Sequence, residues 1–311
     1  MRVLVVGAGA IGGYFGGRLL QAGRDVTFLV RPRRAALLAE HGLSIQSRFG
    51  DFHAPSPPLV TQQDLAEPFD LVVLSCKAYD LDSAIASFVV AVGPKTAILP
   101  LLNGMRQLDV LADRFGGERV LGGLCLISAA LDGKGGIVHL NDIHSLTFGE
   151  LGGARSPRIE TIASTLSGAG FNAQVSHEIR QDMWEKWIFI AAAAGITCLM
   201  RAAVGDIVAA GASDLATRLL NECAAIARAQ GFPQRETSLE RARATLTASG
   251  SVLTASMLRD IEGGMPVEGD HILGDLLRRA AKPDGLSVLH VAYLHVKAYE
   301  ARRMRRETAA N

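Results

Sequence analysis

The stretch Arg2–Arg31, RVLVVGAGAIGGYFGGRLLQAGRDVTFLVR, decides the fold of this chain. Its pattern predicts a strand, a glycine loop, a helix and a second strand. In such a unit Gly7 makes the tight turn, Gly9 lets the backbone approach a pyrophosphate, and Gly12 lets helix and strand pack closely. Free N–H groups and the helix dipole favour an anion there. The residues predicted to hold a dinucleotide are Gly7, Gly9, Ala10, Ile11 and Gly12; a plain tight turn is the alternative.

The end of the second predicted strand, Asp25–Val30, indicates which dinucleotide is bound. Sites that prefer NAD usually carry an acidic residue there to hold the ribose 2′-hydroxyl. This chain has Arg31 instead, followed by Arg33 and Arg34, while Asp25 lies at the wrong end of the strand. A guanidinium suits a 2′-phosphate and accepts nothing from a hydroxyl. NADPH is therefore the predicted cofactor, and a solvated basic turn is the alternative.

Length and composition bound the class of protein. A chain of 311 residues exceeds what one hydrophobic core usually supports, so two domains are expected. With 49% hydrophobic and 20% charged residues the chain is globular. The net charge of +1 gives no reason to expect nucleic acid or an anionic membrane as partner.

The cysteines and the apolar segments bear on the compartment. The four cysteines are far apart and show no metal-ligand spacing, so we expect no metal site and reduced thiols in the cytoplasm. No apolar stretch is expected to be long enough to span a bilayer. The cysteines are Cys76, Cys125, Cys198 and Cys223.

The first half of the chain alternates predicted strands and helices, which is typical of a parallel, doubly wound sheet. The predicted strands are Val3–Val6, Asp25–Val30, Phe69–Ser75 and Thr96–Leu102, and the helices are Tyr14–Ala22, Arg34–His41 and Asp82–Val92. An antiparallel insertion is expected over Leu43–Val60. Antiparallel edge strands (Leu121–Ala130, Gly136–Leu140, Ser145–Gly149), a helix (Pro157–Ala169) and a strand (Asn172–Val175) would finish the domain.

From about Glu178 onward only helical periodicity remains. The fold class predicted is therefore α/β, with an N-terminal Rossmann domain and a C-terminal all-helical domain. We assign residues 1–178 to an NADP-binding domain and 179–311 to a substrate and catalytic domain. The predicted helices are Asp182–Met200, Asp214–Gln230, Glu236–Arg259, Pro266–Ala281 and Ser287–Arg306. Their apolar faces could form a homodimer or pack within the domain.

Four polar residues are candidates for the site. Lys77 and Asn103 follow predicted buried strands, where open parallel sheets bind ligands. A loop lysine and an Asn-Gly turn are the alternatives. Lys186 lies between two tryptophans at the head of an apolar helix; burial lowers the pKa of a lysine and makes it a usable proton donor, although snorkelling is also possible. Glu268 follows a proline, and its alternative is a first-turn carboxylate favoured by the dipole.

These parts together resemble one family, the ketopantoate reductases (2-dehydropantoate 2-reductases). The resemblance covers nearly the whole chain through the glycine loop with Arg31, then CKAYD, LNGM, MWEK and SMLRDIEGGMPVEGDHILGDLL. It implies an NADPH-binding Rossmann domain and a helical domain resembling that of 6-phosphogluconate dehydrogenase, with the active site between them. The implied reaction, a step of pantothenate biosynthesis, reduces 2-dehydropantoate to pantoate, and the substrate partner is a small 2-oxo acid.

The resemblance also implies roles for single residues. Lys186 matches the catalytic lysine and Glu268 the catalytic-site glutamate, while Asn103 matches the asparagine that places lysine and nicotinamide. Ser256 matches the serine that binds the substrate carboxylate. Hydride transfer to a 2-oxo carbon would put charge on the carbonyl oxygen, which Lys186 would stabilise and protonate.

The chain departs from the family pattern at three positions. Ile190, Ala194 and Val204 stand where well-studied members carry asparagines. Lys186, Ile190 and Ala194 share one helix face by spacing, so Ile190 and Ala194 are expected to face the substrate. Other residues fill the asparagine roles, or the substrate is a more apolar carbonyl compound. A dehydrogenase of a 3-hydroxy acid or an imine-forming amino acid, and a nucleotide sensor without turnover, are further alternatives.

Overall fold

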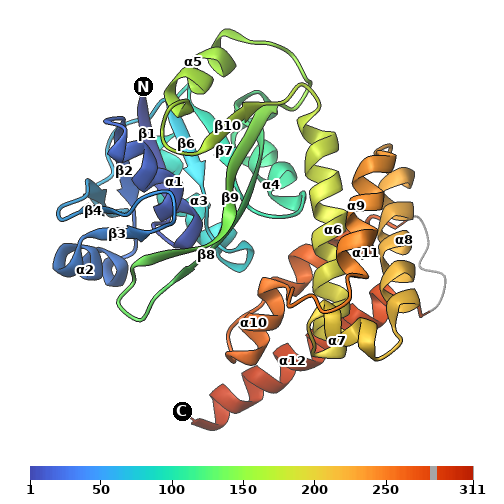
Figure 1. The fold of residues 1–311 in the computed structure, drawn as a ribbon. Coiled ribbons are helices and arrows are strands. Elements are labelled where there is room, and N and C mark those ends of the chain that lie inside the picture. Colours follow the sequence, from blue (N-terminus) through green and yellow to red (C-terminus); the bar gives the residue numbers. More distant parts are fainter. Residues whose placement is uncertain (281–285, 311) are drawn as a thin grey trace. The chain divides into compact units, whose positions relative to one another are not determined.

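The computed structural model describes residues 1–280 and 286–310, which form two compact units. Unit 1 comprises Met1–Leu102 and Gln107–Arg180; unit 2 comprises Asn103–Arg106 and the chain from Gln181 onward. Figure 1 labels their elements. The assignment of cofactor and substrate roles to residues 1–178 and 179–311 stays a prediction.

A parallel five-stranded sheet forms the centre of unit 1. Its strand order is β5-β2-β1-β6-β7, so the glycine loop after β1 and the loops after β2 and β6 leave one edge of the sheet side by side. Every residue of β6 and β7 is buried, as expected for parallel strands covered on both faces. The strands are β1 (Arg2–Val6), β2 (Asp25–Leu29), β5 (Leu59–Val60), β6 (Leu71–Leu74) and β7 (Ala97–Pro100). The predicted Rossmann fold class is confirmed.

The strands predicted between residues 121 and 175 form a second sheet. They pair with one another and with the insertion, in the order β10-β9-β3-β4, with β8 on β9. The segments Gly136–Leu140 and Ser145–Gly149 are one strand, because β9 stays paired with β8 across a register shift near Ile127. The strands are β3 (Leu43–Gln46), β4 (Phe52–Ala54), β8 (Leu121–Leu131), β9 (Ile137–Glu150) and β10 (Asn172–Val175).

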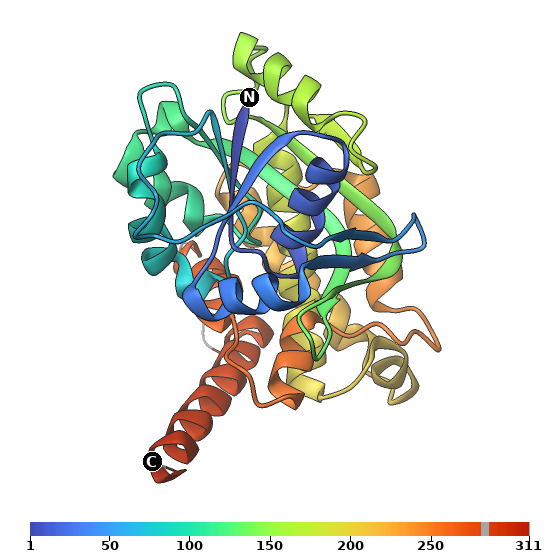
Figure 2. The ribbon, with the colours of Figure 1, turned by 90° about the vertical axis from the view of Figure 1, so that its left-hand side faces the viewer.

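The helices of unit 1 start where local sequence favours them. Pro32 and Pro157 occupy first-turn positions, and the Ser156 hydroxyl accepts a hydrogen bond from the Ile159 N–H. Figure 2 shows the blue helices α1 and α2 in front of this unit. The helices are α1 (Ala10–Gln21), α2 (Pro32–His41), α3 (Leu81–Phe88), α5 (Pro157–Leu166) and α4 (Arg106–Phe115), the last of which no prediction covered.

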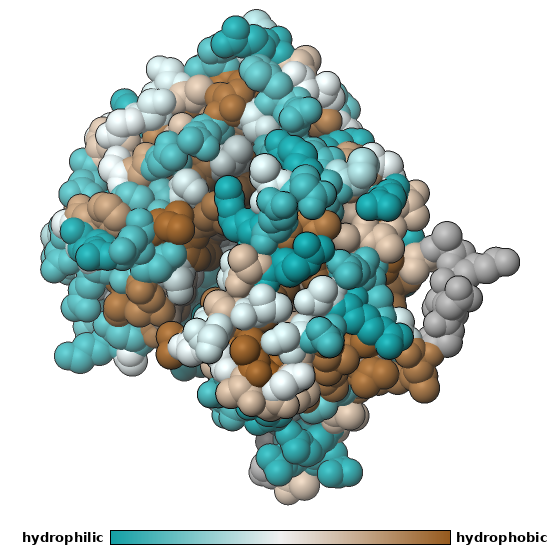
Figure 3. Space-filling model, turned by 45° about the vertical axis from the view of Figure 1, so that its right-hand side comes forward, coloured by the Kyte–Doolittle hydropathy of each residue, from teal (hydrophilic) through white to brown (hydrophobic). Residues whose placement is uncertain are grey.

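Unit 2 is helical among its described residues. The elements are α6 (Ile179–Met200), α7 (Val204–Ala209), α8 (Ser213–Ala229), α9 (Glu236–Leu246), α10 (Ser256–Glu262), the π-helical turn η4 (Asp270–Gly274), α11 (Asp275–Arg278) and α12 (Val288–Ala310). Helix α12 is a single long helix that runs to the C-terminal end (Figures 1 and 2). The face of the molecule in Figure 3 mixes polar and apolar residues.

Two helix predictions in unit 2 were wrong. The predicted helix Glu236–Arg259 ends at Leu246, because the following segment bonds to α7: Gly205 N–H donates to the Ser251 carbonyl at 2.7 Å and Val204 N–H to the Leu253 carbonyl at 3.0 Å. The predicted helix Pro266–Ala281 begins only at Asp270, and Ala281 lies outside the described residues. Tertiary hydrogen bonds overrode the local periodicity in the first case.

Helix α6 also corrects the membrane expectation. By length and composition this 22-residue helix could span a bilayer, contrary to the prediction that no apolar stretch is long enough. In the structure 67% of its most apolar window is buried inside the protein. Burial of this extent is the usual finding for the core helix of a folded domain.

Candidate active site

The glycine loop of unit 1 makes a tight turn between β1 and α1. Gly7 has φ +94°, a conformation that side chains rarely adopt, and its N–H donates to the Leu29 carbonyl at 3.0 Å. A Cβ on Gly12 would lie 2.0 Å from Ser75 Oγ and 2.1 Å from the Gly7 carbonyl oxygen. A Cβ on Gly9 would meet nothing within 4 Å. The loop thus packs tightly below α1 and leaves space above Gly9 for a ligand.

Arg31 lies beside the loop and carries an ion pair that the sequence did not suggest. Its Nη2 donates to Asp80 Oδ1 at 2.8 Å and to Ser83 Oγ at 3.0 Å. The hydrogen bond that Arg31 donates to Asp80 raises the pKa of the guanidinium. Asp80 ends the short turn that follows β6 and Lys77. The basic corner predicted for a 2′-phosphate therefore also holds a carboxylate.

Arg34, on the first turn of α2, supports the same loop. Its Nε donates to the Ala8 carbonyl at 2.9 Å, and burial lowers the pKa of its guanidinium. This bond ties the start of α2 to the backbone between Gly7 and Gly9. Arg34 was predicted only as part of a basic turn.

In unit 2, Lys186 lies on α6 between two buried tryptophans. Trp184 is 1% exposed and Trp187 is fully buried, with ring centroids 4.8 Å apart. Trp187 Nε1 donates to the Ile272 carbonyl at 3.0 Å, which joins the lysine-bearing turn of α6 to η4. Lys186 itself is partly buried. The buried tryptophans and the bond to the Ile272 carbonyl hold the turn of α6 that carries it.

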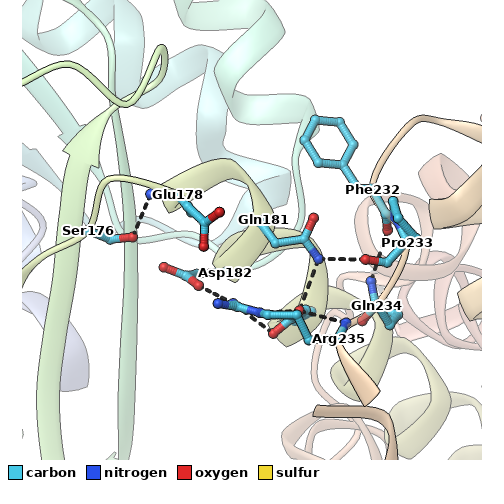
Figure 4. Close-up of polar contacts among 9 residues, drawn as sticks. Ser176, Glu178, Gln181, Asp182, Phe232, Pro233, Gln234 and Arg235 are labelled. Atoms are coloured by element: carbon cyan, nitrogen blue, oxygen red, sulfur yellow. Dashed lines mark hydrogen bonds and ion pairs between the residues drawn. The ribbon is translucent and has the colours of Figure 1, made fainter. Parts of the chain in front are cut away.

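Glu185, the residue before the lysine, is held by a second set of contacts, and Figure 4 labels its partners Gln181 and Arg235. Arg235 donates to both carboxylate oxygens of Glu185, through Nε at 2.7 Å and Nη2 at 2.9 Å, and it also bonds to Asp182. Gln181 Nε2 donates to Glu185 and to the Pro233 carbonyl, both at 2.9 Å. Burial raises the pKa of Glu185, but the bonds from Arg235 and Gln181 outweigh it, so the pKa lies below its ordinary value. Glu185 is therefore a structural anion.

The backbone carbonyls of Glu268 and Asn103 both accept hydrogen bonds from residues of η4. The Glu268 carbonyl accepts from the N–H groups of His271 (3.1 Å) and Ile272 (2.9 Å), which begins η4. His271 Nε2 lies 2.7 Å from the Asn103 carbonyl oxygen, so this nitrogen carries the proton and donates. Gly104 has φ +85°, and a Cβ there would lie 3.1 Å from His271 Nε2. The turn that carries Asn103 is thus held by a buried histidine three residues after Glu268.

The remaining predicted residues differ in exposure. Ser256 is exposed as the first residue of α10, whose start is tied to α6 because Ala255 N–H donates to Thr197 Oγ1 at 3.4 Å. Ile190 is partly buried, whereas Ala194 and Val204 are buried.

The structure thus joins the predicted residues within each unit. The glycine loop, Arg31 and Lys77 share the carboxyl edge of the parallel sheet in unit 1. In unit 2, the backbone segments that carry Asn103, Lys186 and Glu268 are each tied to η4 by a hydrogen bond. Sequence reasoning missed Asp80, His271 and Arg235; the first two lie inside the quoted motifs CKAYD and VEGDHILGD, but nothing local indicated their partners.

Fold and site geometry define an oxidoreductase built on a dinucleotide-binding domain and a helical domain. The family model described as "Ketopantoate reductase PanE/ApbA" matches residues 3–153, and that of its C-terminal part matches residues 178–297. The chain belongs to the ketopantoate reductase family.

Two relatives show how the family is represented. The chain is 40% identical to "Uncharacterized oxidoreductase YkpB" of Bacillus subtilis, over 97% of this chain and 99% of that protein. It is 29% identical to a 2-dehydropantoate 2-reductase of Halobacterium salinarum, over 91% and 93% of the two chains.

Solved structures share the architecture. A 2-dehydropantoate 2-reductase from Methylococcus capsulatus has a TM-score of 0.85 at 26% identity, covering 97% of this chain and 98% of that chain. D-mandelate dehydrogenase, solved with NADH and anilino(oxo)acetate, has a TM-score of 0.85 at 23% identity, covering 97% and 99%, and shows the same fold.

Proposed function

We propose that this protein reduces 2-dehydropantoate, or a related 2-oxo acid, to the 2-hydroxy acid with NADPH in the cytoplasm. The observation that supports the proposal is that the segments carrying Asn103, Lys186 and Glu268 are all bonded to η4, in a chain whose other unit has a glycine loop with an arginine beside it. The four cysteines lie far apart in the sequence and show no metal-ligand spacing, which supports a reducing compartment.

The residues present fit a nicotinamide dinucleotide. Space above Gly9 and the N-terminus of α1 suit a pyrophosphate, and Arg31 suits a 2′-phosphate. When bound, the cofactor supplies a hydride to the carbonyl carbon of the substrate. The residues of this chain supply the binding and the proton.

Lys186 would stabilise the negative charge that develops on the carbonyl oxygen and donate a proton to it, which yields the 2-hydroxy acid. Glu268 would accept a hydrogen bond from the new hydroxyl and orient it, and Asn103 would position Lys186 and the nicotinamide. The Ser256 hydroxyl would donate to the substrate carboxylate. Proton donation by a side chain to the carbonyl oxygen contributes about 10²–10⁴-fold to the rate.

A second candidate is reduction of a more apolar carbonyl compound. Ile190 and Ala194 follow Lys186 at helix spacings of four and eight, and neither side chain can pair with a substrate hydroxyl. A buried hydroxyl left without a partner costs about 1–3 kcal/mol, so this face would favour a substrate without one.

The decisive experiment replaces the proton donor. In Lys186→Ala, kcat should fall by about 10²–10⁴-fold while NADPH binds with unchanged Kd, because the removed group acts on the substrate oxygen. Steady-state NADPH oxidation with 2-dehydropantoate and fluorescence titration of NADPH measure the two quantities. Wild-type kcat in the variant would contradict the proposal.

Comparing 2-dehydropantoate with an analogue that lacks the distal hydroxyl separates the two candidates. A higher kcat/KM for 2-dehydropantoate supports the first candidate, and a higher kcat/KM for the analogue supports the second. Ile190→Asn is the matched variant: adding an amide at this position should shift the ratio toward the hydroxylated substrate if Ile190 faces it.

A further inference from the structure

The ion pair between Arg31 and Asp80 lies at the corner of unit 1 where Arg31 was expected to meet a 2′-phosphate alone. Asp80 Oδ1 accepts from Arg31 Nη2 at 2.8 Å, and the two side chains keep 32% and 67% of their exposure, respectively. Both residues leave the carboxyl edge of the same sheet, Arg31 after β2 and Asp80 after β6. A carboxylate that could accept a hydrogen bond from a ribose hydroxyl is therefore present. It follows β6, whereas NAD-preferring sites usually carry this carboxylate at the end of β2.

The Asp80 side chain does not cap the helix that it precedes. Asp80 occupies the N-cap position of α3, yet its side chain makes no capping hydrogen bond. Its backbone carbonyl instead accepts from the Ser83 hydroxyl at 2.9 Å, and Ser83 Oγ in turn accepts from Arg31 at 3.0 Å. The carboxylate thus faces Arg31 rather than its own helix.

Stability does not account for the pair either. Ion pairs this exposed shift a folding equilibrium by about fivefold at most, because water screens both charges. An exposed pair at the mouth of a ligand site is more consequential for binding, where a ligand group replaces the partner of Arg31.

The two nicotinamide cofactors would interact with this pair differently. A ribose 2′-hydroxyl can donate to the Asp80 carboxylate while Arg31 stays paired. A 2′-phosphate competes with the Asp80 carboxylate for the Arg31 guanidinium, and that carboxylate then lies beside an anion of the same sign. Asp80 therefore favours the hydroxyl and opposes the phosphate, whereas Arg31 does the reverse.

We propose that Asp80 is a specificity-determining residue that weakens the preference for NADPH and makes NADH a usable second cofactor. The proposal rests on the proposed function in one respect, the placement of the adenosine ribose at Arg31. It goes beyond that function because it assigns the choice of cofactor to the balance of two opposed charges from different strands.

The test measures Kd for NADPH and for NADH with the wild type, Asp80→Asn and Asp82→Asn. Asp82 is exposed in the first turn of α3, so its variant removes the same charge without touching the partner of Arg31. In Asp80→Asn the ratio of the two Kd values should shift toward NADPH by about tenfold or more, from loss of the competing pair and of like-charge repulsion. In Asp82→Asn the ratio should stay within about twofold.

A double-mutant cycle with Arg31→Ala completes the test. If Asp80 acts through Arg31, then Asp80→Asn should tighten NADPH binding much less in the Arg31→Ala background than in the wild type. An unchanged Kd ratio in Asp80→Asn, or equal shifts in Asp80→Asn and Asp82→Asn, would overturn the proposal.

Direct titration needs no substrate, so the outcome is independent of the reaction. Absence of turnover with every 2-oxo acid would refute the proposed function while the Kd ratios still decide the role of Asp80. Failure of the wild type to bind either dinucleotide would refute both.

Discussion

Two arginine–carboxylate contacts, one in each unit, show opposite designs. In unit 1, Arg31 and Asp80 form a single-bonded pair whose side chains are 67% and 32% exposed. In unit 2, Arg235 makes a bidentate contact with Glu185 through Nε and Nη2, and the Glu185 side chain is only 10% exposed. The first contact is inexpensive to open and so can be exchanged for a ligand. The second cannot be opened without leaving a buried charge, and so it fixes the helix that carries Lys186.

The same contrast extends to the neighbouring hydrogen bonds. Unit 2 adds two hydrogen bonds at η4, a buried one from Trp187 to the Ile272 carbonyl and a partly buried one from His271 to the Asn103 carbonyl. Unit 1 offers the ligand a glycine loop with open space above Gly9. The predicted catalytic residues thus lie on a largely buried scaffold, whereas the predicted cofactor corner is formed by groups that water can reach. Groups that stabilise a transition state act best when their positions are fixed, which a buried environment favours. Groups that exchange partners with a ligand need an exposed environment.

The largest effect should come from breaking the buried contact. Arg235→Gln leaves the Glu185 carboxylate without its bidentate partner, and we expect the free energy of unfolding to fall by about 2 kcal/mol. Arg31→Gln is the matched control: the exposed pair should contribute less than about 0.5 kcal/mol. Urea unfolding of both variants measures the difference, and equal losses would contradict the contrast between the units.

The next effect concerns the turn that carries Asn103. In His271→Phe the Asn103 carbonyl loses its donor, so kcat should fall about tenfold, because small misplacements of site residues are costly in rate. In His271→Gln an amide N–H replaces the Nε2 donor and most of the loss should be recovered. His295→Phe, the same change on α12, serves as control for the loss of a partly buried imidazole.

Steady-state kinetics with NADPH, together with hydrogen exchange of a peptide spanning residues 101–108, distinguishes positioning from general destabilisation. Faster exchange of this peptide in His271→Phe but not in His271→Gln is the expected pattern. Equal activity of all three variants would show that the bond has no role in catalysis.

The smallest effect is a pH dependence of stability. Burial lowers the pKa of His271 below 6.5, although the bond to the Asn103 carbonyl opposes this shift. The unfolded chain therefore takes up a proton more readily than the folded protein, and stability is lost as the pH falls below about 6.5. Compared with the wild type, His271→Gln should flatten the loss of unfolding free energy between pH 7 and pH 5, as urea unfolding at the two pH values would measure. An unaltered slope in His271→Gln would show that this imidazole is not held neutral.

The sequence by itself determined the fold class, the family and the chemical identity of the candidate site. These three predictions depend on short stretches of sequence. The stretches are the glycine loop between strand and helix and the motifs that contain Lys77, Asn103, Lys186, Ser256 and Glu268. Such patterns depend on periods of two and 3.6 residues and on loop chemistry, which act over a few positions. The family-level predictions were confirmed for this reason.

The tertiary structure alone decided how those residues are supported. Asp80 meets Arg31 across 49 residues of sequence, and His271 meets Asn103 across 168. The break after Leu246 and the second sheet likewise arise from hydrogen bonds between distant segments. No local pattern encodes such contacts, because they form only when sheet edges and helix faces bring the partners together. Whether Arg31 stands alone or beside a carboxylate was therefore settled by the fold and not by the motif.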